Sequence, residues 1–283
     1  MNVGVICRAK GFEDTRMKLG WWSYPVDGLE WTFYPVKDSE CVDLAKLSAP
    51  HDVLVYEDWA WPHLHGVASV PVLAVVVDSN TSERRFRMYH ERVKVADAIL
   101  LDQEDLRRFA DLGRPVYRWS YGVNEHVFYP RPKITDVGYH VARTPERGEF
   151  ATELLHWVRG TGYSYAMGGG MACEEYAVKV GEAKILIHLA THPQCRSHRF
   201  FDALASGCCL LSNHVKPVRE DGFQIRRHFM EWATLGELAT QIEHLLRTGL
   251  WETIAQEGRQ FVLENHTWKH RASEFISIVE ELV

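Results

Sequence analysis

Short apolar runs alternate with amphipathic stretches along this chain, and this alternation constrains the fold more than any other feature. The clearest run, residues 72–77 (VLAVVV), is continuous, which is typical of a strand buried on both faces. Strands that alternate with helices form βαβ units and a largely parallel sheet. The sequence therefore predicts an α/β protein, and its 283 residues suffice for two domains of this kind.

The pattern places the expected elements in two series on either side of a linker at residues 121–133. In the first series, strands are expected at Val3–Cys7, Trp31–Val36, Asp52–Tyr56, Pro71–Val77, Ala98–Leu101 and Pro115–Trp119, and helices at Glu40–Leu47, Ser82–Val95 and Gln103–Leu112. In the second, strands are expected at Thr135–Val141, Tyr163–Met167, Lys184–Leu189, Cys208–Ser212 and Gln224–Phe229, and helices at Arg147–Val158, Cys173–Val180, His198–Ser206, Leu235–Arg247, Trp251–Glu264 and Trp268–Leu282. Two doubly wound halves predict a ligand cleft at the carboxyl ends of their strands.

Composition excludes several other classes of protein. A hydrophobic fraction of 46% and a charged fraction of 25% are those of an ordinary globular protein rather than a disordered one. We find no apolar run of the roughly 18 residues that cross a bilayer and no signal-peptide pattern at the N-terminus. The net charge of −6 does not indicate a nucleic-acid-binding chain. Six scattered cysteines without a CxxC pair are expected to be reduced thiols in the cytoplasm.

The stretch 192–212 carries the clearest chemistry. A polar loop leads into a short expected helix that holds one acid, Asp202, and a buried strand follows. An acid near the start of a helix, at the mouth of a sheet, can accept hydrogen bonds from ribose hydroxyls, and the helix N-terminus suits a phosphate. The alternative is that Asp202 merely stabilises the first turn of the helix.

Residues 199–211 (RFFDALASGCCLL) resemble the nucleotide-sugar signature of GT-B glycosyltransferases, especially the CgeB-like group with its R-x-F-E-A-L-A-C-G pattern. The resemblance implies two Rossmann-like domains with a cleft between them, a C-terminal helix that crosses back to the first domain, and a UDP-sugar as the donor. It also implies that Asp202 binds the donor ribose. Related retaining family-four enzymes carry a second acid eight positions earlier, where this chain has Gln194, so the CgeB-like interpretation is favoured.

Residues 137–148 (VGYHVARTPERG) are similar to the V-G-R-x-x-P-E-K-G element of the same enzymes, with two cations four residues apart. A transferase that uses no metal needs cations against the charge that builds on the leaving diphosphate. The resemblance implies that Arg143 and Arg147 hold this diphosphate. The alternative is an exposed basic turn paired with Glu146 or Glu149.

Four further segments agree with the resemblance in order along the chain: residues 96–106, 121–130, 165–170 and 264–276. The implied domains are 1–125 on the acceptor side and 126–265 on the donor side, with 266–283 as the crossing helix. Four more residues are assigned to the donor, namely Gly11, Gly168, His188 and Arg199. For Gly11 an ordinary turn is an equal alternative.

The acceptor side matches less well, so its candidates are chosen by position. Asp78 directly follows the 72–77 run and is the first candidate for a polar group at the reacting centre, as a base or to orient the acceptor. Helix capping by Asp78, Ser79 or Ser82 is the alternative. Glu57 and Asp58 compete for the base role. Tryptophans that could stack on a sugar or base are Trp21, Trp22, Trp59 and Trp61.

The resemblance thus implies a glycosyltransferase, and the kinship with the family-four enzymes implies that it retains the anomeric configuration. No histidine pair shows a metal-binding spacing, so no obligatory metal is expected. A basic stretch at residues 82–94 keeps a phage-type transferase acting on hydroxymethylated DNA bases as an alternative acceptor assignment, against a merely solvated helix face. The missing acid at Gln194 keeps a second alternative function, a catalytically silent nucleotide-sugar-binding module. An epimerase of the same fold is a third alternative function.

Overall fold

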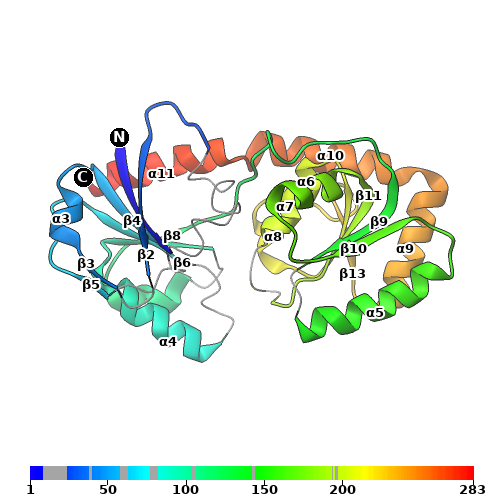
Figure 1. Ribbon diagram of the computed structural model, residues 1–283, viewed down its shortest axis with the longest axis horizontal. Helices are drawn as coiled ribbons and strands as arrows, with labels where there is room; N and C mark the ends of the chain where they lie inside the picture. The colour runs from blue at the N-terminus through cyan, green and yellow to red at the C-terminus, as the bar shows by residue number, and fades with distance from the viewer. Residues whose placement is uncertain are drawn as a thin grey trace. The chain divides into compact units, whose positions relative to one another are not determined.

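The computed structural model describes residues 1–8, 24–37, 40–57, 63–76, 82–102, 106–141, 144–192, 194 and 197–283, and for Arg8 and Glu57 it describes the backbone alone. These residues form two compact units (Figure 1). Unit 1 consists of Met1–Ser120 together with Lys269–Val283, and unit 2 of Tyr121–Trp268.

Unit 1 contains a parallel six-stranded sheet in the order β2-β1-β4-β6-β7-β8. In chain order its strands are β1 (Asn2–Arg8), β2 (Glu30–Val36), β4 (Val53–Glu57), β6 (Val72–Val76), β7 (Ala98–Leu101) and β8 (Val116–Arg118). A small second sheet pairs β3 (Cys41–Asp43) with β5 (His63–His65). The helical segments are α3 (Leu44–Ser48), α4 (Glu83–Arg92), η3 (Val93–Val95), η4 (Leu106–Leu112) and α11 (Trp268–Leu282).

The core of unit 1 forms where these helices cover the sheet. Tyr89 of α4, Phe109 of η4 and Leu44 of α3 are buried in one apolar cluster with side chains of β4, β6 and β7. Every residue of β6 is buried, as the continuous apolar run predicts. From α11, the ring of Phe275 lies 6.0 Å from that of Trp31 on β2.

Unit 2 contains a parallel five-stranded sheet in the order β10-β9-β11-β12-β13. Its strands are β9 (Thr135–His140), β10 (Tyr165–Gly168), β11 (Ala183–His188), β12 (Cys209–Asn213) and β13 (Met230–Trp232). Its helices are α5 (Pro145–Arg159), α6 (Cys173–Gly181), α7 (His198–Ala205), α8 (Lys216–Glu220), α9 (Leu235–Thr248) and α10 (Leu250–Asn265). The predicted α/β class with parallel sheets is confirmed.

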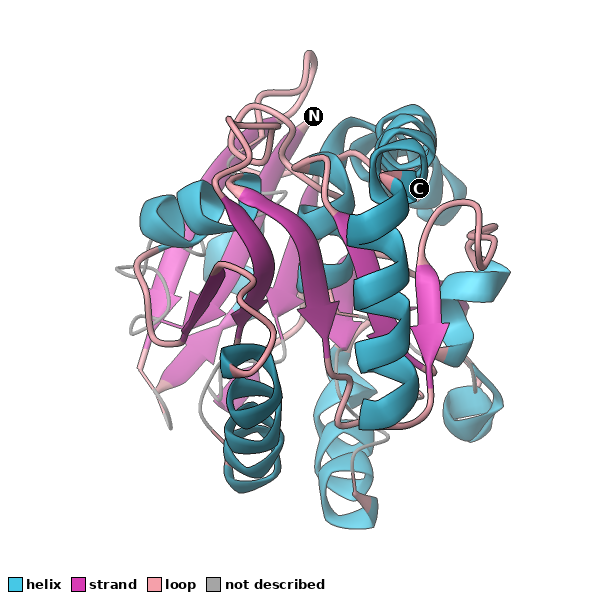
Figure 2. Ribbon diagram, turned by 90° about the vertical axis from the view of Figure 1, so that its right-hand side faces the viewer, coloured by secondary structure: helices cyan, strands magenta, loops and turns pink. Residues whose placement is uncertain are grey.

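Helices cover both faces of the unit 2 sheet (Figure 2). On one face, residues of α5 and α9 share an apolar cluster with alternate residues of β9, β11 and β12. On the other face, α6 packs on β9 and β11, and α7 packs on β11 and β12. Consecutive residues of one strand therefore contact different helices.

Three local expectations are wrong in position or type. Residues 224–229 form a turn with an isolated bridge between Ile225 and Phe229, and the fifth strand of unit 2 starts only at Met230. Part of the helix expected at Glu40–Leu47 is strand β3, because Cys41–Asp43 pairs with β5. The last expected helix of the first series is a 3₁₀ segment over its described part, Leu106–Leu112.

Two segments far apart in the sequence run side by side in unit 2. Val123 is fully buried, accepts a hydrogen bond from Trp268 N and donates one to His266 O. A Cβ on Gly122 would lie 2.8 Å from backbone atoms of Thr267 and Trp268. Glycine is therefore required here for the close approach of two backbones.

Candidate functional site

The strands of unit 2 end together at one edge of the sheet, because they are parallel. We call this edge, where β9, β11 and β12 end at His140, His188 and Asn213, the carboxyl edge. Helix α5 begins shortly after β9, and α7 follows β11. The helices that follow strands thus bring their first turns, with Arg147 and Arg199, to this edge.

Arg147 is positioned by the start of α5. Thr144 caps the helix by accepting from the backbone N–H of Arg147 at 3.4 Å, and Pro145 occupies the first helical turn, where it needs no hydrogen-bond donor. The guanidinium Nη2 of Arg147 lies 3.5 Å from Thr191 Oγ1, which follows β11. Arg199, the second residue of α7, is half-buried.

Both guanidinium groups act on the same two buried side chains. Burial first, and then the charges of Arg199 and Arg147, lower the pKa of His188 to about 3. The same two charges oppose the burial that raises the pKa of Tyr139 to about 12. Arg147 and Arg199, separated by 52 positions in the sequence (199 minus 147), therefore converge on one place at the carboxyl edge.

The hydrogen bonds of His188 fix which of its ring nitrogens accepts. Ser212 Oγ donates its one hydrogen to Asn213 O at 2.9 Å, so it accepts from His188 Nδ1 at 2.8 Å. Nε2 then carries no hydrogen, since the lowered pKa of His188 keeps the ring neutral. His188 thus offers an acceptor nitrogen beside two cations.

Asp202 is the fifth residue of α7 and is only 7% exposed. The alternative that it stabilises the first turn is wrong, since no acid lies in that turn. Burial raises the pKa of Asp202 well above its ordinary value, and the charge of Arg199 opposes this rise. Burial, and then the charge of Asp202, raise the pKa of Tyr176 on α6. The hydroxyl of Tyr176 makes no hydrogen bond with any residue the structure describes.

The remaining predicted donor residue of this unit, Gly168, ends β10 and so also reaches the carboxyl edge. A Cβ there would collide with the end of the Met171 side chain, which is flexible, so the steric demand for glycine is mild. Gln194, eight positions before Asp202, is exposed.

Several candidates lie outside the described residues: on the acceptor side Trp21, Trp22, Asp58, Trp59, Trp61 and Asp78, and on the donor side Gly11 and Arg143. Glu57 ends β4, and only its backbone is described. These assignments stay predictions. Within the described ranges, no three His, Cys, Asp or Glu side chains gather as a metal site would require.

Sequence reasoning missed Tyr139, Ser212 and Tyr176. Tyr139 lies inside a quoted motif, but its aromatic ring was indistinguishable from an ordinary core residue. Ser212 could not be assigned from the sequence, because only the register between β11 and β12 pairs it with His188. That register is a property of the folded sheet rather than of either strand alone.

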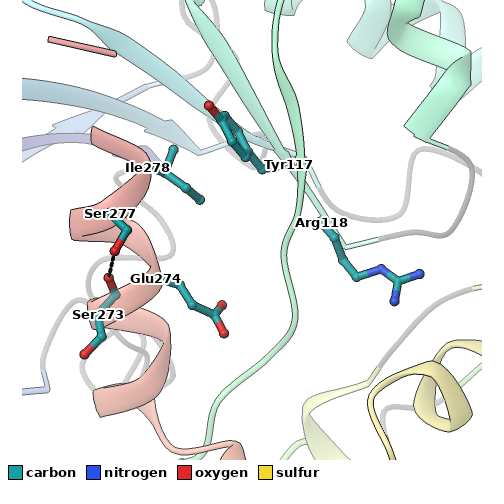
Figure 3. A pocket seen from close by; sticks show the side chains of 6 residues that line it. All are labelled: Tyr117, Arg118, Ser273, Glu274, Ser277 and Ile278. Carbon is teal, nitrogen blue, oxygen red and sulfur yellow. Dashed lines mark hydrogen bonds between the residues drawn. The ribbon is translucent and has the colours of Figure 1, made fainter. Parts of the chain in front are cut away.

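Unit 1 contains a shallow groove of about 430 Å³, and none of the predicted site residues lines it (Figure 3). Its lining residues are Tyr117, Arg118, Ser273, Glu274, Ser277 and Ile278. Several of their polar atoms have partners within unit 1. Tyr117 Oη donates to Glu281 Oε2 at 3.0 Å, and both serine hydroxyls donate to carbonyls of α11.

Residues 142–277 match a protein family described as glycosyl transferase-like. These residues form a glycosyl transferase-like domain. It contains Arg147, Gly168, His188, Arg199 and Asp202, so the carboxyl edge of unit 2 lies within it. No curated protein matches the chain, and no helix in the described ranges is both long and apolar enough to span a membrane.

Solved structures show the same fold over the whole chain. Sucrose-phosphate synthase from Thermosynechococcus elongatus is 12% identical, with a TM-score of 0.66 and coverage of 100% of this chain and 99% of that one. HepE from Anabaena, solved in complex with UDP-glucose, is 11% identical, with a TM-score of 0.67 and coverage of 99% and 100%. A glycosyltransferase from Rickettsia africae is 11% identical, with a TM-score of 0.65 and coverage of 99% and 98%. The fold of this glycosyltransferase is therefore GT-B-like.

Proposed function

We propose that this glycosyltransferase moves a sugar from a nucleotide-diphosphate donor to an acceptor hydroxyl, with retention and without a metal. One observation carries the proposal: Arg147 and Arg199 converge at the carboxyl edge of unit 2. Ligands of doubly wound folds bind at such an edge. Negative charge builds on the leaving diphosphate as the glycosidic bond breaks, and two fixed guanidinium groups stabilise that charge.

The donor is a UDP-sugar in this proposal, and the support is that HepE, of the same fold, was solved with UDP-glucose. Asp202 accepts hydrogen bonds from the ribose hydroxyls, and Gly168 lets the backbone approach the nucleotide. The acceptor nitrogen of His188 accepts a hydrogen bond from a hydroxyl of the donor. Arg143 joins Arg147 on the diphosphate. The kinship with the CgeB-like group, which rests on residues 199–211, belongs to the proposal too.

Unit 1 takes the acceptor. Asp78 serves as the polar group at the reacting centre, with Glu57 and Asp58 as its rivals for the base role. Trp59 and Trp61 stack on the acceptor, and Gly11 lets the backbone approach the transferred sugar. The reaction runs in the cytoplasm, as the six cysteines predict. The support for this half is the order of the sequence motifs.

The test is a panel of UDP-, GDP-, ADP- and dTDP-sugars, measured by thermal shift and by turnover. Wild type is expected to be stabilised by one nucleotide class, and Arg147→Ala is expected to lose at least tenfold in affinity for it. Arg159→Ala is the matched control, because Arg159 lies at the opposite end of the same helix. Stabilisation by no nucleotide, or equal affinity in wild type and Arg147→Ala, would refute the site.

Turnover in the same panel separates the other functions. Donor hydrolysis or transfer supports an enzyme, whereas binding without either supports a silent nucleotide-sugar-binding module. Conversion of the donor sugar to its epimer without an acceptor supports an epimerase. Chelator is added to one arm, and a loss of turnover there would overturn metal independence.

A DNA acceptor is the second candidate, and helix α4 favours it. Residues 82–94 carry five Lys and Arg against two Glu in a chain of net charge −6. Arg84, Arg85 and Arg87 are exposed, and Arg87 pairs with Glu83. A charge-reversed Arg84→Glu/Arg85→Glu variant should lose duplex-DNA binding that itself falls steeply with salt. Wild-type chain that binds no DNA at low salt would remove this candidate.

A further inference from the structure

Tyr139 is a deeply buried polar side chain near the two arginines. It is the penultimate residue of β9 and is 1% exposed. Its ring packs edge-on against Phe150 of α5, with centroids 5.2 Å apart. Its hydroxyl makes no hydrogen bond with any residue the structure describes. A buried hydroxyl without a partner costs folding free energy, so this position calls for an explanation.

The groups around the hydroxyl limit what its partner can be. Both arginine charges act on it, and its raised pKa keeps the hydrogen in place, so it can donate. A guanidinium group has no acceptor atom and cannot take that hydrogen. His188 lies towards Phe200 of α7, on the face of the sheet opposite Phe150. One anion with several oxygen acceptors would suit the Tyr139 hydroxyl and both guanidinium groups.

We propose that Tyr139 is a ligand of the donor's diphosphate, donating its hydroxyl hydrogen to an oxygen that Arg147 and Arg199 also hold. This inference rests on the proposed function, because it places the nucleotide diphosphate at the carboxyl edge of unit 2. Tyr139 supplies a directed hydrogen bond where the arginines supply charge. The hydrogen bond strengthens as the diphosphate leaves, since the oxygens gain charge.

The experiment replaces only the hydroxyl, with Tyr139→Phe. Affinity is measured by calorimetry for UDP and for uridine, which lacks the diphosphate. We expect the variant to bind UDP about tenfold more weakly and uridine as wild type does, while the melting temperature of the ligand-free protein stays equal or rises. Tyr129→Phe is the matched control: Tyr129 is 40% exposed and packs on Arg131, so both affinities should be unchanged.

The outcomes separate this inference from the proposed function. Unchanged UDP affinity in Tyr139→Phe, with weakened UDP binding in Arg147→Ala, overturns the role of Tyr139 and leaves the diphosphate site standing. An equal loss for UDP and uridine also overturns it, because a merely structural role would weaken both. Wild type that binds neither UDP nor any other nucleoside diphosphate of the panel refutes the proposed function itself.

Discussion

The two ends of the unit 2 sheet differ in how their polar side chains are paired, although Ser206 Oγ at the amino end also has no hydrogen-bond partner among the described residues. At the amino end, Lys133 Nζ donates to Gly181 O at 2.8 Å and to Ser206 O at 3.0 Å, which closes the last turns of α6 and α7. Asp136 accepts from Lys184 and Ser164. At the carboxyl edge, by contrast, several buried polar atoms have no hydrogen-bond partner among the described residues: Tyr139 Oη, Tyr176 Oη and both ring nitrogens of His140.

The contrast distinguishes an end whose paired polar groups add stability from an end that suits the proposed donor. Buried polar groups are normally paired, because an unpaired one loses its hydrogen bonds to water without replacement. Hydrogen-bonded polar groups at the amino end add to the stability of the fold, whereas unpaired donors and acceptors at the carboxyl edge lower it.

Lys133→Met should destabilise unit 2 by about 3 kcal/mol, because it leaves two helix-terminal carbonyls without their shared donor. Urea unfolding followed by tryptophan fluorescence measures the change. Lys179→Met is the control: Lys179 makes a partly exposed pair with Glu182 within one helix turn, and its loss should cost under about 1 kcal/mol. Equal costs in the two variants would show that the amino end is not the stabilising end.

His188 should make wild type lose stability in mild acid. Its folded pKa of about 3 lies below the ordinary 6.5, so between these values the unfolded chain binds a proton that the folded chain refuses. Stability from this residue is complete above pH 6.5 and falls by about 2 kcal/mol between pH 6.5 and 5. His188→Gln should flatten that part of the curve. A parallel pH dependence in variant and wild type would contradict the buried neutral histidine.

Asp136→Asn should cost about 1 kcal/mol at pH 7. Burial raises the pKa of Asp136, but hydrogen bonds from Lys184 and Ser164 outweigh this and lower it overall. A lowered acid pKa gives stability above the unfolded value of 3.8 and loses it as pH falls through the folded value. The gap between variant and wild type should therefore close below about pH 4. A gap that persists there would mean that lost packing dominates.

Tyr176→Phe should leave the ligand-free protein as stable as wild type or more stable by up to about 1 kcal/mol. Its hydroxyl is buried without a hydrogen bond among the described residues, so its removal relieves a cost. Thermal unfolding without nucleotide is the measurement. A clear loss of stability would show that the carboxyl edge is already satisfied, and would weaken the contrast.

The candidate site could be predicted from sequence only where one local string carries the information. The motif at residues 199–211 led to Asp202, and the residues 137–148 led to Arg147. The role of Tyr139 could not be predicted, because the sequence of a strand does not show whether a tyrosine hydroxyl contacts water, a protein group or a ligand. The strand expected at Gln224–Phe229 failed for a related reason: pairing with β12 decided that Met230–Trp232 is the strand.

By itself, the sequence determined the alternation of strands and helices, the buried central strand β6 and the glycosyltransferase character of residues 142–277. These depend on periodicity and on short strings, which act over a few neighbouring residues. It is the tertiary structure that brings Arg147 and Arg199 near the same two side chains, and that puts Tyr139 and His188 on opposite sides of one sheet. The physical reason is that strand register and helix placement are set by contacts between distant segments, which no local pattern contains.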